Sequence, residues 1–70
     1  MVIDFSQGKL IVTPDEVQIR LADATLYAMA EDIKFKTDVL IMYADAGAVR
    51  WSIKLDSFDQ LSLIKNTLMI

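Results

Sequence analysis

The alternation of apolar and polar residues over positions 38–55, DVLIMYADAGAVRWSIKL, predicts a β-hairpin with a strongly apolar first arm. A three-residue loop at 45–47, with Gly47 in a left-handed conformation, sets the preferred register. That register predicts one core face, made of Val39, Ile41, Tyr43, Val49, Trp51 and Ile53. On the other face it pairs Met42 with Arg50, Leu40 with Ser52 and Asp38 with Lys54. A two-residue loop at 46–47 would instead oppose Asp38 to Leu55.

Residues 2–13 predict a second hairpin, in which two apolar arms flank the turn SQGK. Gly8 would supply the positive φ that a tight turn requires. Pairing Phe5 with Leu10 and Ile3 with Val12 places these four side chains on one face.

Residues 14–34 are predicted to form a helix. Thr13 is a candidate N-cap, Pro14 suits the first helical position, and Glu16 completes a capping box. Polar residues then recur every three or four positions as one acidic stripe: Glu16, Arg20, Asp23, Tyr27, Glu31 and Lys34. The alternative is a strand containing Val17, Ile19 and Leu21, with a helix only after Asp23. The lack of Gly in 9–46 favours the helix, although residues 16–22 stay open between helix and strand.

A second helix is predicted from Ser57 to about residue 67. Ser57 is a favourable N-cap, and Gln60 at the third helical position completes a capping box. Four apolar residues share one side of this helix and are expected to pack on the sheet: Phe58, Leu61, Ile64 and Leu68.

These elements, in the order β-β-α-β-β-α, predict a single α+β domain spanning residues 1–70. No linker or low-complexity segment divides the chain. We expect an antiparallel sheet with both helices packed mainly on one face.

Composition suggests that this domain self-associates. A 70-residue domain has a thin core, yet 54% of the residues are hydrophobic and the mean hydropathy is +0.38. With no Cys or His, neither disulfides nor the commonest metal ligands can add stability. A homo-oligomer, simplest as a dimer, is therefore expected. The absence of Cys, of a signal peptide and of a long apolar run predicts a cytoplasmic protein without membrane contact.

Candidate chemistry is sparse, so the chain is not expected to be an enzyme. Without His or Cys, acid–base and nucleophilic roles fall to carboxylates, lysines and hydroxyls. Thr13 and Ser57 are better explained as helix caps, and Glu31 and Asp32 would point apart on a helix. No phosphate-loop, dinucleotide or calcium-loop motif is present, which predicts no catalytic residue, cofactor or metal.

The sequence instead predicts a small acidic protein that regulates or inhibits an unidentified protein partner. The expected partner surface is the outer face of the hairpin at 38–55, or else the acidic helix stripe. On that hairpin face the predicted interface residues are Leu40, Met42, Arg50, Ser52 and Lys54.

An alternative is a nucleic-acid-binding module that uses a basic sheet face. The predicted contacts are Lys34, Lys36, Arg50 and Lys54. Two observations count against this alternative. The net charge is −3, and the preferred register places Tyr43 and Trp51 on the opposite face of the hairpin, so no aromatic side chain on the basic face could stack on a nucleobase.

Overall fold

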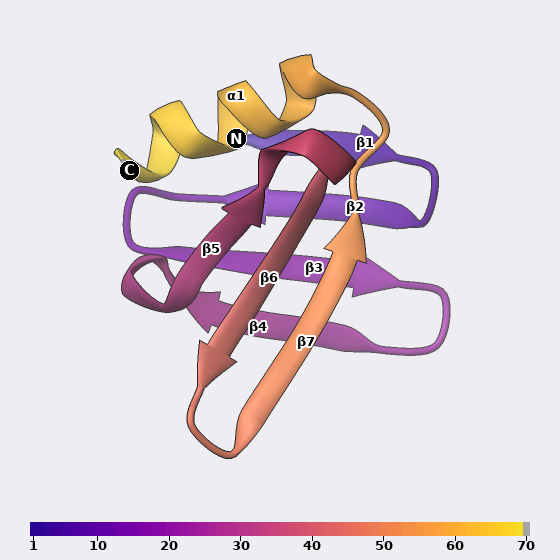
Figure 1. Ribbon diagram of the computed structural model, residues 1–70. Coiled ribbons are helices and arrows are strands. Elements are labelled where there is room, and N and C mark those ends of the chain that lie inside the picture. The colour runs from indigo at the N-terminus through magenta and orange to yellow at the C-terminus, as the bar shows by residue number, and fades with distance from the viewer. Residues whose placement is uncertain (70) are drawn as a thin grey trace.

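The computed structural model describes residues 1–69, which fold into two antiparallel β-sheets and one α-helix (Figure 1). The first sheet has four strands in chain order: β1 (Val2–Phe5), β2 (Gly8–Val12), β3 (Glu16–Leu21) and β4 (Thr25–Met29). The second has three: β5 (Ile33–Lys36), β6 (Ile41–Ala46) and β7 (Val49–Lys54). Short 3₁₀ turns, η1 (Ala30–Asp32) and η2 (Thr37–Val39), flank β5, and α1 (Phe58–Leu68) ends the fold.

The two sheets face each other and their strands cross at a steep angle, with α1 lying along one end of the stack (Figure 1). The core lies between them. The four-stranded sheet contributes Ile3, Phe5, Leu10, Val12, Val17 and Ile19, while the other sheet contributes Ile33, Met42, Ala44 and Ile53. Leu61, Ile64 and Leu68 close the core from the helix. The α+β class is confirmed, but the predicted order with two helices is wrong.

The first hairpin has the predicted faces in a different register. Phe5 pairs with Gly8 and Ile3 with Leu10, so the turn is the two-residue step at 6–7. The shift from the predicted pairing is two residues, which leaves every side chain on its predicted face because strand side chains repeat every two residues. Gly8 has a φ of 153°, and a Cβ at this position would overlap the carbonyl oxygen of Arg20 on β3. Gly8 therefore allows close strand approach rather than forming the turn itself.

The β6–β7 hairpin has a register that exchanges the two faces of β6. Met42 pairs with Ile53, Tyr43 with Ser52 and Asp45 with Arg50 around a two-residue turn at 47–48. Gly47, with φ 75°, occupies the first turn position, as a type II′ turn favours. This register differs from the predicted one by an odd number of residues. Met42 therefore points into the core, whereas Tyr43 points outward.

The predicted helix at 14–34 is wrong, because this stretch forms β3, β4 and η1. The alternative was right about the strand at 17–21 and wrong about a helix after Asp23. The Thr13 hydroxyl does accept hydrogen bonds from the backbone of Asp15 and Glu16, at 3.3 and 3.1 Å. The Thr13 N–H also donates to the Glu16 carbonyl at 3.0 Å, which turns the chain back as a hairpin. A Thr hydroxyl can accept such hydrogen bonds at the start of a helix or in the turn of a hairpin, so this contact does not distinguish the two.

The C-terminal helix is confirmed. The Ser57 hydroxyl accepts a 3.3 Å hydrogen bond from the Gln60 N–H, and the Gln60 side chain accepts a 2.9 Å bond from the backbone of Asp56. Leu61, Ile64 and Leu68 are buried as predicted, but Phe58, in the first turn, is 56% exposed. No helix in residues 1–69 is long and apolar enough to cross a membrane.

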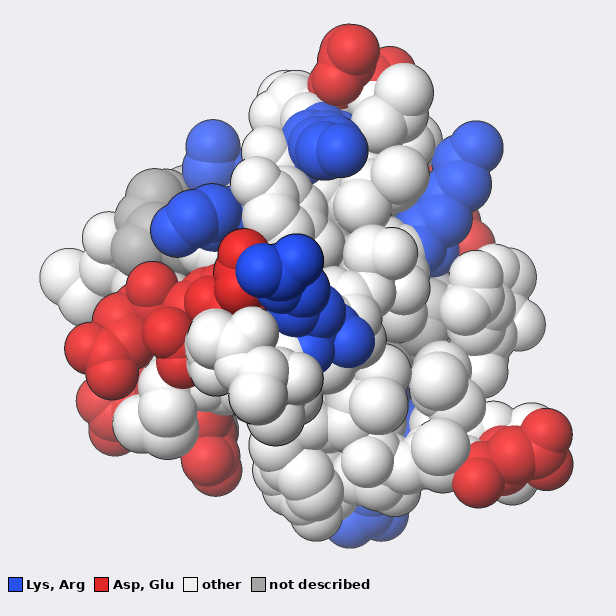
Figure 2. Space-filling model, turned by 60° about the horizontal axis from the view of Figure 1, so that its bottom comes forward, with Lys and Arg blue, Asp and Glu red and all other residues white. Residues whose placement is uncertain are grey.

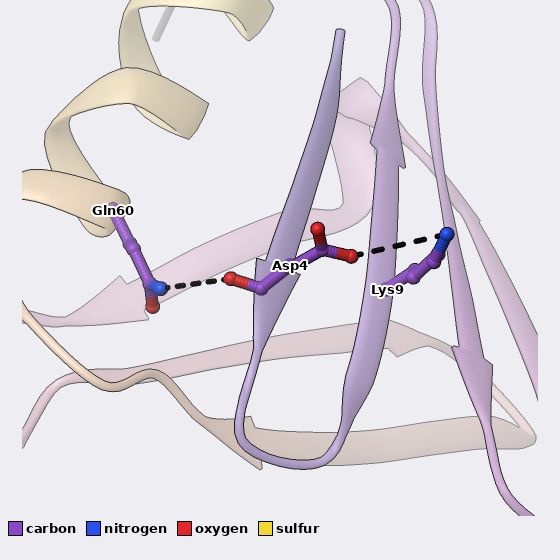
Figure 3. A network of polar contacts seen from close by, with 3 residues as sticks. All are labelled: Asp4, Lys9 and Gln60. Carbon is purple, nitrogen blue, oxygen red and sulfur yellow. Dashed lines mark hydrogen bonds and ion pairs between the residues drawn. The ribbon is translucent and has the colours of Figure 1, made fainter.

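Polar contacts clasp the start of α1 to β1. The Gln60 amide donates to the backbone carbonyl of Asp4 at 3.3 Å, beside the exposed Asp4–Lys9 ion pair (Figure 3). Ser6 in the first turn donates its N–H to the Asp56 carboxylate at 2.9 Å. Hydrogen bonding from Ser6 is the main cause that lowers the pKa of the Asp56 carboxyl below 3.8; partial desolvation opposes it, and Gln60 lowers the pKa a little further.

Replacing Met42 tests the observed register. Met42→Ala removes a side chain that is 0% exposed, so we expect a loss of about 2–5 kcal/mol in the free energy of unfolding. The control Val49→Ala truncates a side chain that is 60% exposed and should cost about 0.5 kcal/mol or less. Urea unfolding followed by circular dichroism measures both. Equal, small effects would contradict the register.

The Asp56 clasp predicts a specific pH dependence. The pKa of the Asp56 carboxyl in the folded protein lies below the ordinary 3.8. The stabilising contribution of the ionised carboxylate is therefore complete above that value and is lost as the pH falls through the lowered pKa. The stability difference between the wild type and Asp56→Asn should therefore shrink progressively as the pH falls below the ordinary pKa range of an aspartate. Asp23→Asn, at a turn residue without a hydrogen bond or ion pair to any residue in 1–69, should show no such trend. A pH-independent difference for Asp56→Asn would refute the clasp.

Candidate binding face on the three-stranded sheet

The outer face of the β5–β6–β7 sheet gathers basic side chains on both sides of β6, which presents an aliphatic and an aromatic side chain. Because side chains alternate along a strand, Lys34 and Lys36 point outward from β5, and Arg50, Ser52 and Lys54 point outward from β7. The β6 residues between them are Ile41, Tyr43 and Asp45. Cross-strand pairing aligns Lys34, Tyr43 and Ser52 in one row and Lys36, Ile41 and Lys54 in the next. We call this surface the basic face.

Tyr43 lies at the centre of the basic face and is half-buried. The Lys36 ammonium lies 5.7 Å from the centre of its ring, within the range of a cation–π contact. A shallow hollow of about 490 Å³ adjoins the ring, lined on this face by Lys36, Ile41, Tyr43, Asp45, Arg50 and Ser52. An aromatic ring with an aliphatic neighbour and cations on both sides can hold a flat, anionic ligand.

Charge is distributed unevenly over the molecule. Four of the seven basic residues lie on the basic face with one acid, a local charge of +3, although the chain carries −3. Asp45 pairs with Arg50 at 3.3 Å. No ion pair joins Lys34, Lys36 or Lys54 to an acid within the described chain. Figure 2 shows a dense group of acidic side chains at the left of the molecule. Basic side chains lie at the centre and in the upper part of the same view.

The structure brings together most, but not all, of the residues predicted from sequence. Lys34, Lys36, Arg50, Ser52 and Lys54 share the basic face and are exposed. Leu40 lies in the bend before β6, where its φ is 57° and its side chain packs against the core. Met42 is fully buried on the inner face. Neither Leu40 nor Met42 is part of the face that they were predicted to form.

Sequence reasoning missed the centre of the face: Ile41, Tyr43 and Asp45. The available signal was Gly47 itself, since glycine at the first position of a two-residue turn is the type II′ pattern. That turn also sets Asp45 opposite Arg50, an opposite-charge pair.

The face has no arrangement suited to acid–base chemistry. Its one carboxylate is paired with Arg50, and its hydroxyls, on Tyr43 and Ser52, lie beside no His or Cys because the chain has neither. Among residues 1–69 no group of three or more acidic side chains is placed to hold a metal ion.

Comparison with known proteins gives one match. A family model described as "Protein of unknown function (DUF3389)" matches residues 1–70, the full length of the chain. The chain belongs to the DUF3389 family. No curated protein and no solved structure matched. Membership in DUF3389 names no activity.

Proposed function

We propose that this DUF3389 chain is a non-enzymatic binding protein whose basic face holds single-stranded nucleic acid. The observation that carries the proposal is the outward position of Tyr43 among Lys34, Lys36, Arg50 and Lys54. The main structural argument against this function was that no aromatic side chain lay on the basic face. The observed register places Tyr43 there.

The basic side chains are spaced to follow a phosphate backbone. Lys34 and Lys36 line one edge of the face, and Arg50 and Lys54 line the other, with β6 between them. Cations on two edges can contact successive phosphates, while Ser52 offers a hydroxyl hydrogen bond. Such contacts supply affinity without reading sequence.

Tyr43 gives the reason for a single strand. Its ring is reached from the outer face and can stack on an unpaired base, which a duplex keeps inside its own stack. Lys36, which lies over the ring, is a flexible side chain that can move aside to meet a phosphate. Base–aromatic stacking contributes about 1–3 kcal/mol per base.

The test is fluorescence anisotropy with labelled oligo(dT) and oligo(rU) in low salt. We expect binding that weakens as salt is added. A plot of the logarithm of the binding constant against the logarithm of the salt concentration should have a slope of up to about −3 if all four basic side chains contact phosphates. Arg50→Glu with Lys54→Glu should weaken binding by about tenfold or more, because two attractive charges become repulsive.

The matched control is Lys9→Glu with Arg20→Glu. These residues form a cross-strand pair on the outer face of the other sheet, so the charge change is the same at a different place. Equal losses in both double variants, or no binding to either oligonucleotide, would overturn the proposal.

Asp45 should act as an internal competitor for the ligand. Its carboxylate holds Arg50 at 3.3 Å, so a phosphate must displace it. Asp45→Asn removes that competition and one repelling charge, and we expect about threefold to tenfold tighter binding at low salt. Unchanged or weaker binding in the same anisotropy assay would show that Arg50 does not contact the ligand.

We propose, second, a cytoplasmic protein-interaction role in which the chain regulates a partner and acts as a homodimer. The favouring observation is the number of large apolar side chains left exposed in so small a domain, including Tyr27, Met29, Val49, Phe58 and Leu63. Light scattering of the purified chain should give twice the monomer mass of 7.9 kDa. A folded monomer at micromolar concentration would end the homodimer proposal.

A further inference from the structure

An apolar groove opens where the edge of the four-stranded sheet meets the edge of the three-stranded sheet. β4 and β7 are the edge strands there, and they do not pair with each other. The groove has a volume of about 290 Å³ and is lined by Tyr27, Ala28, Met29, Ala44, Val49 and Trp51. We call it the Trp51 groove. It lies on the inner side of the β6–β7 hairpin, away from the basic face.

Small side chains leave the groove open, and one hydrogen bond joins its two edges. Ala28 and Ala44 leave space on its floor, where larger residues would fill the gap between the sheets. The Trp51 indole N–H donates to the Tyr27 carbonyl at 3.3 Å and bridges the two edges. The rim side chains Tyr27 and Val49 are each 60% exposed. A volume of about 290 Å³ is at the lower limit of ligand pockets and suits one bulky side chain.

Acidic residues surround this apolar space. Glu16 and Asp32 line the groove itself. Asp15 and Glu31 lie beside them, because the Ala30 N–H donates to the Asp15 carbonyl at 2.8 Å and so joins η1 to the start of β3. Two carboxylates therefore line the apolar slot, and two more lie next to it along the same edge. Two copies facing each other symmetrically here would bring these acids together, and like charges in contact disfavour that arrangement.

We propose that the Trp51 groove docks a segment of a partner protein in which one bulky apolar side chain is flanked by Lys or Arg. The apolar side chain would lie over Ala28 and Ala44 beside the Trp51 ring, and the flanking cations would meet Glu16 and Asp32. This combination of a central apolar anchor and a charged rim is the usual anatomy of a binding hot spot. The inference rests on the proposed protein-interaction role and is independent of nucleic-acid binding.

Trp51 is the only tryptophan, so its fluorescence reports on the groove directly. The probe is the peptide Lys-Lys-Phe-Lys-Lys, with Lys-Lys-Ser-Lys-Lys and Glu-Glu-Phe-Glu-Glu as comparisons. We expect a saturable blue shift of the Trp51 emission with the first peptide. Each comparison peptide should bind at least about tenfold more weakly, since one lacks the anchor and the other carries the wrong charge.

Two variants locate the site. Ala28→Leu fills the floor and should abolish the shift, with circular dichroism confirming that the fold is kept. Glu16→Gln with Asp32→Asn leaves the floor intact and should weaken binding by about tenfold. The matched control, Asp23→Asn with Asp59→Asn, removes the same charge elsewhere and should bind like the wild type.

Several outcomes would overturn the groove. They are equal binding of the Phe and Ser peptides, binding unaffected by Ala28→Leu, or equal losses in the two charge variants. Light scattering without peptide separates this inference from the homodimer: a dimer that shows no peptide response overturns the groove alone, whereas a monomer that binds the Phe peptide overturns the homodimer alone. A dimer that dissociates on Ala28→Leu would assign the groove to a second copy and refute the partner proposal.

Discussion

The register of the β6–β7 hairpin is the constraint on which the rest of the structure depends. Gly47, with its positive φ, allows a two-residue turn, and that turn decides which residues of β6 face inward. Met42 and Ala44 then complete the core against the four-stranded sheet. The intervening residues Tyr43 and Asp45 must face solvent between the two basic strands. A change of one residue in the pairing would reverse both assignments.

This single choice produces two surfaces of opposite character on one thin hairpin. Outward side chains form the basic face around Tyr43, while inward side chains near the turn leave the acid-rimmed Trp51 groove. The separation is possible because the core is held elsewhere, by the inner faces of both sheets and by α1, which is clasped to β1 through Gln60 and Asp56.

Sequence signals within a single turn, such as helix caps, predicted some of these elements. They failed where pairing with a neighbouring strand decides whether a segment is a helix or a strand. The capping box at Ser57 and Gln60 is a contact within one turn, and it predicted α1 correctly. Thr13 makes equally local contacts, but they are compatible with a helix or a hairpin, and β3 is a strand because β2 and β4 pair with both its edges. The basic residues of the candidate site were predictable from charge. Tyr43 was assigned to the wrong face, because its orientation depends on the hairpin register, and a two-residue turn and a three-residue loop set that register differently.

The most direct test of this account is the pattern of cross-strand nuclear Overhauser effects in the β6–β7 hairpin, measured by NMR on the isotopically labelled chain. The observed register predicts contacts between Tyr43 and Ser52 and between Met42 and Ile53 across the strands. Contacts of Tyr43 with Val49 and of Met42 with Arg50 would contradict it. That result would return Tyr43 to the core and remove the aromatic centre of the basic face.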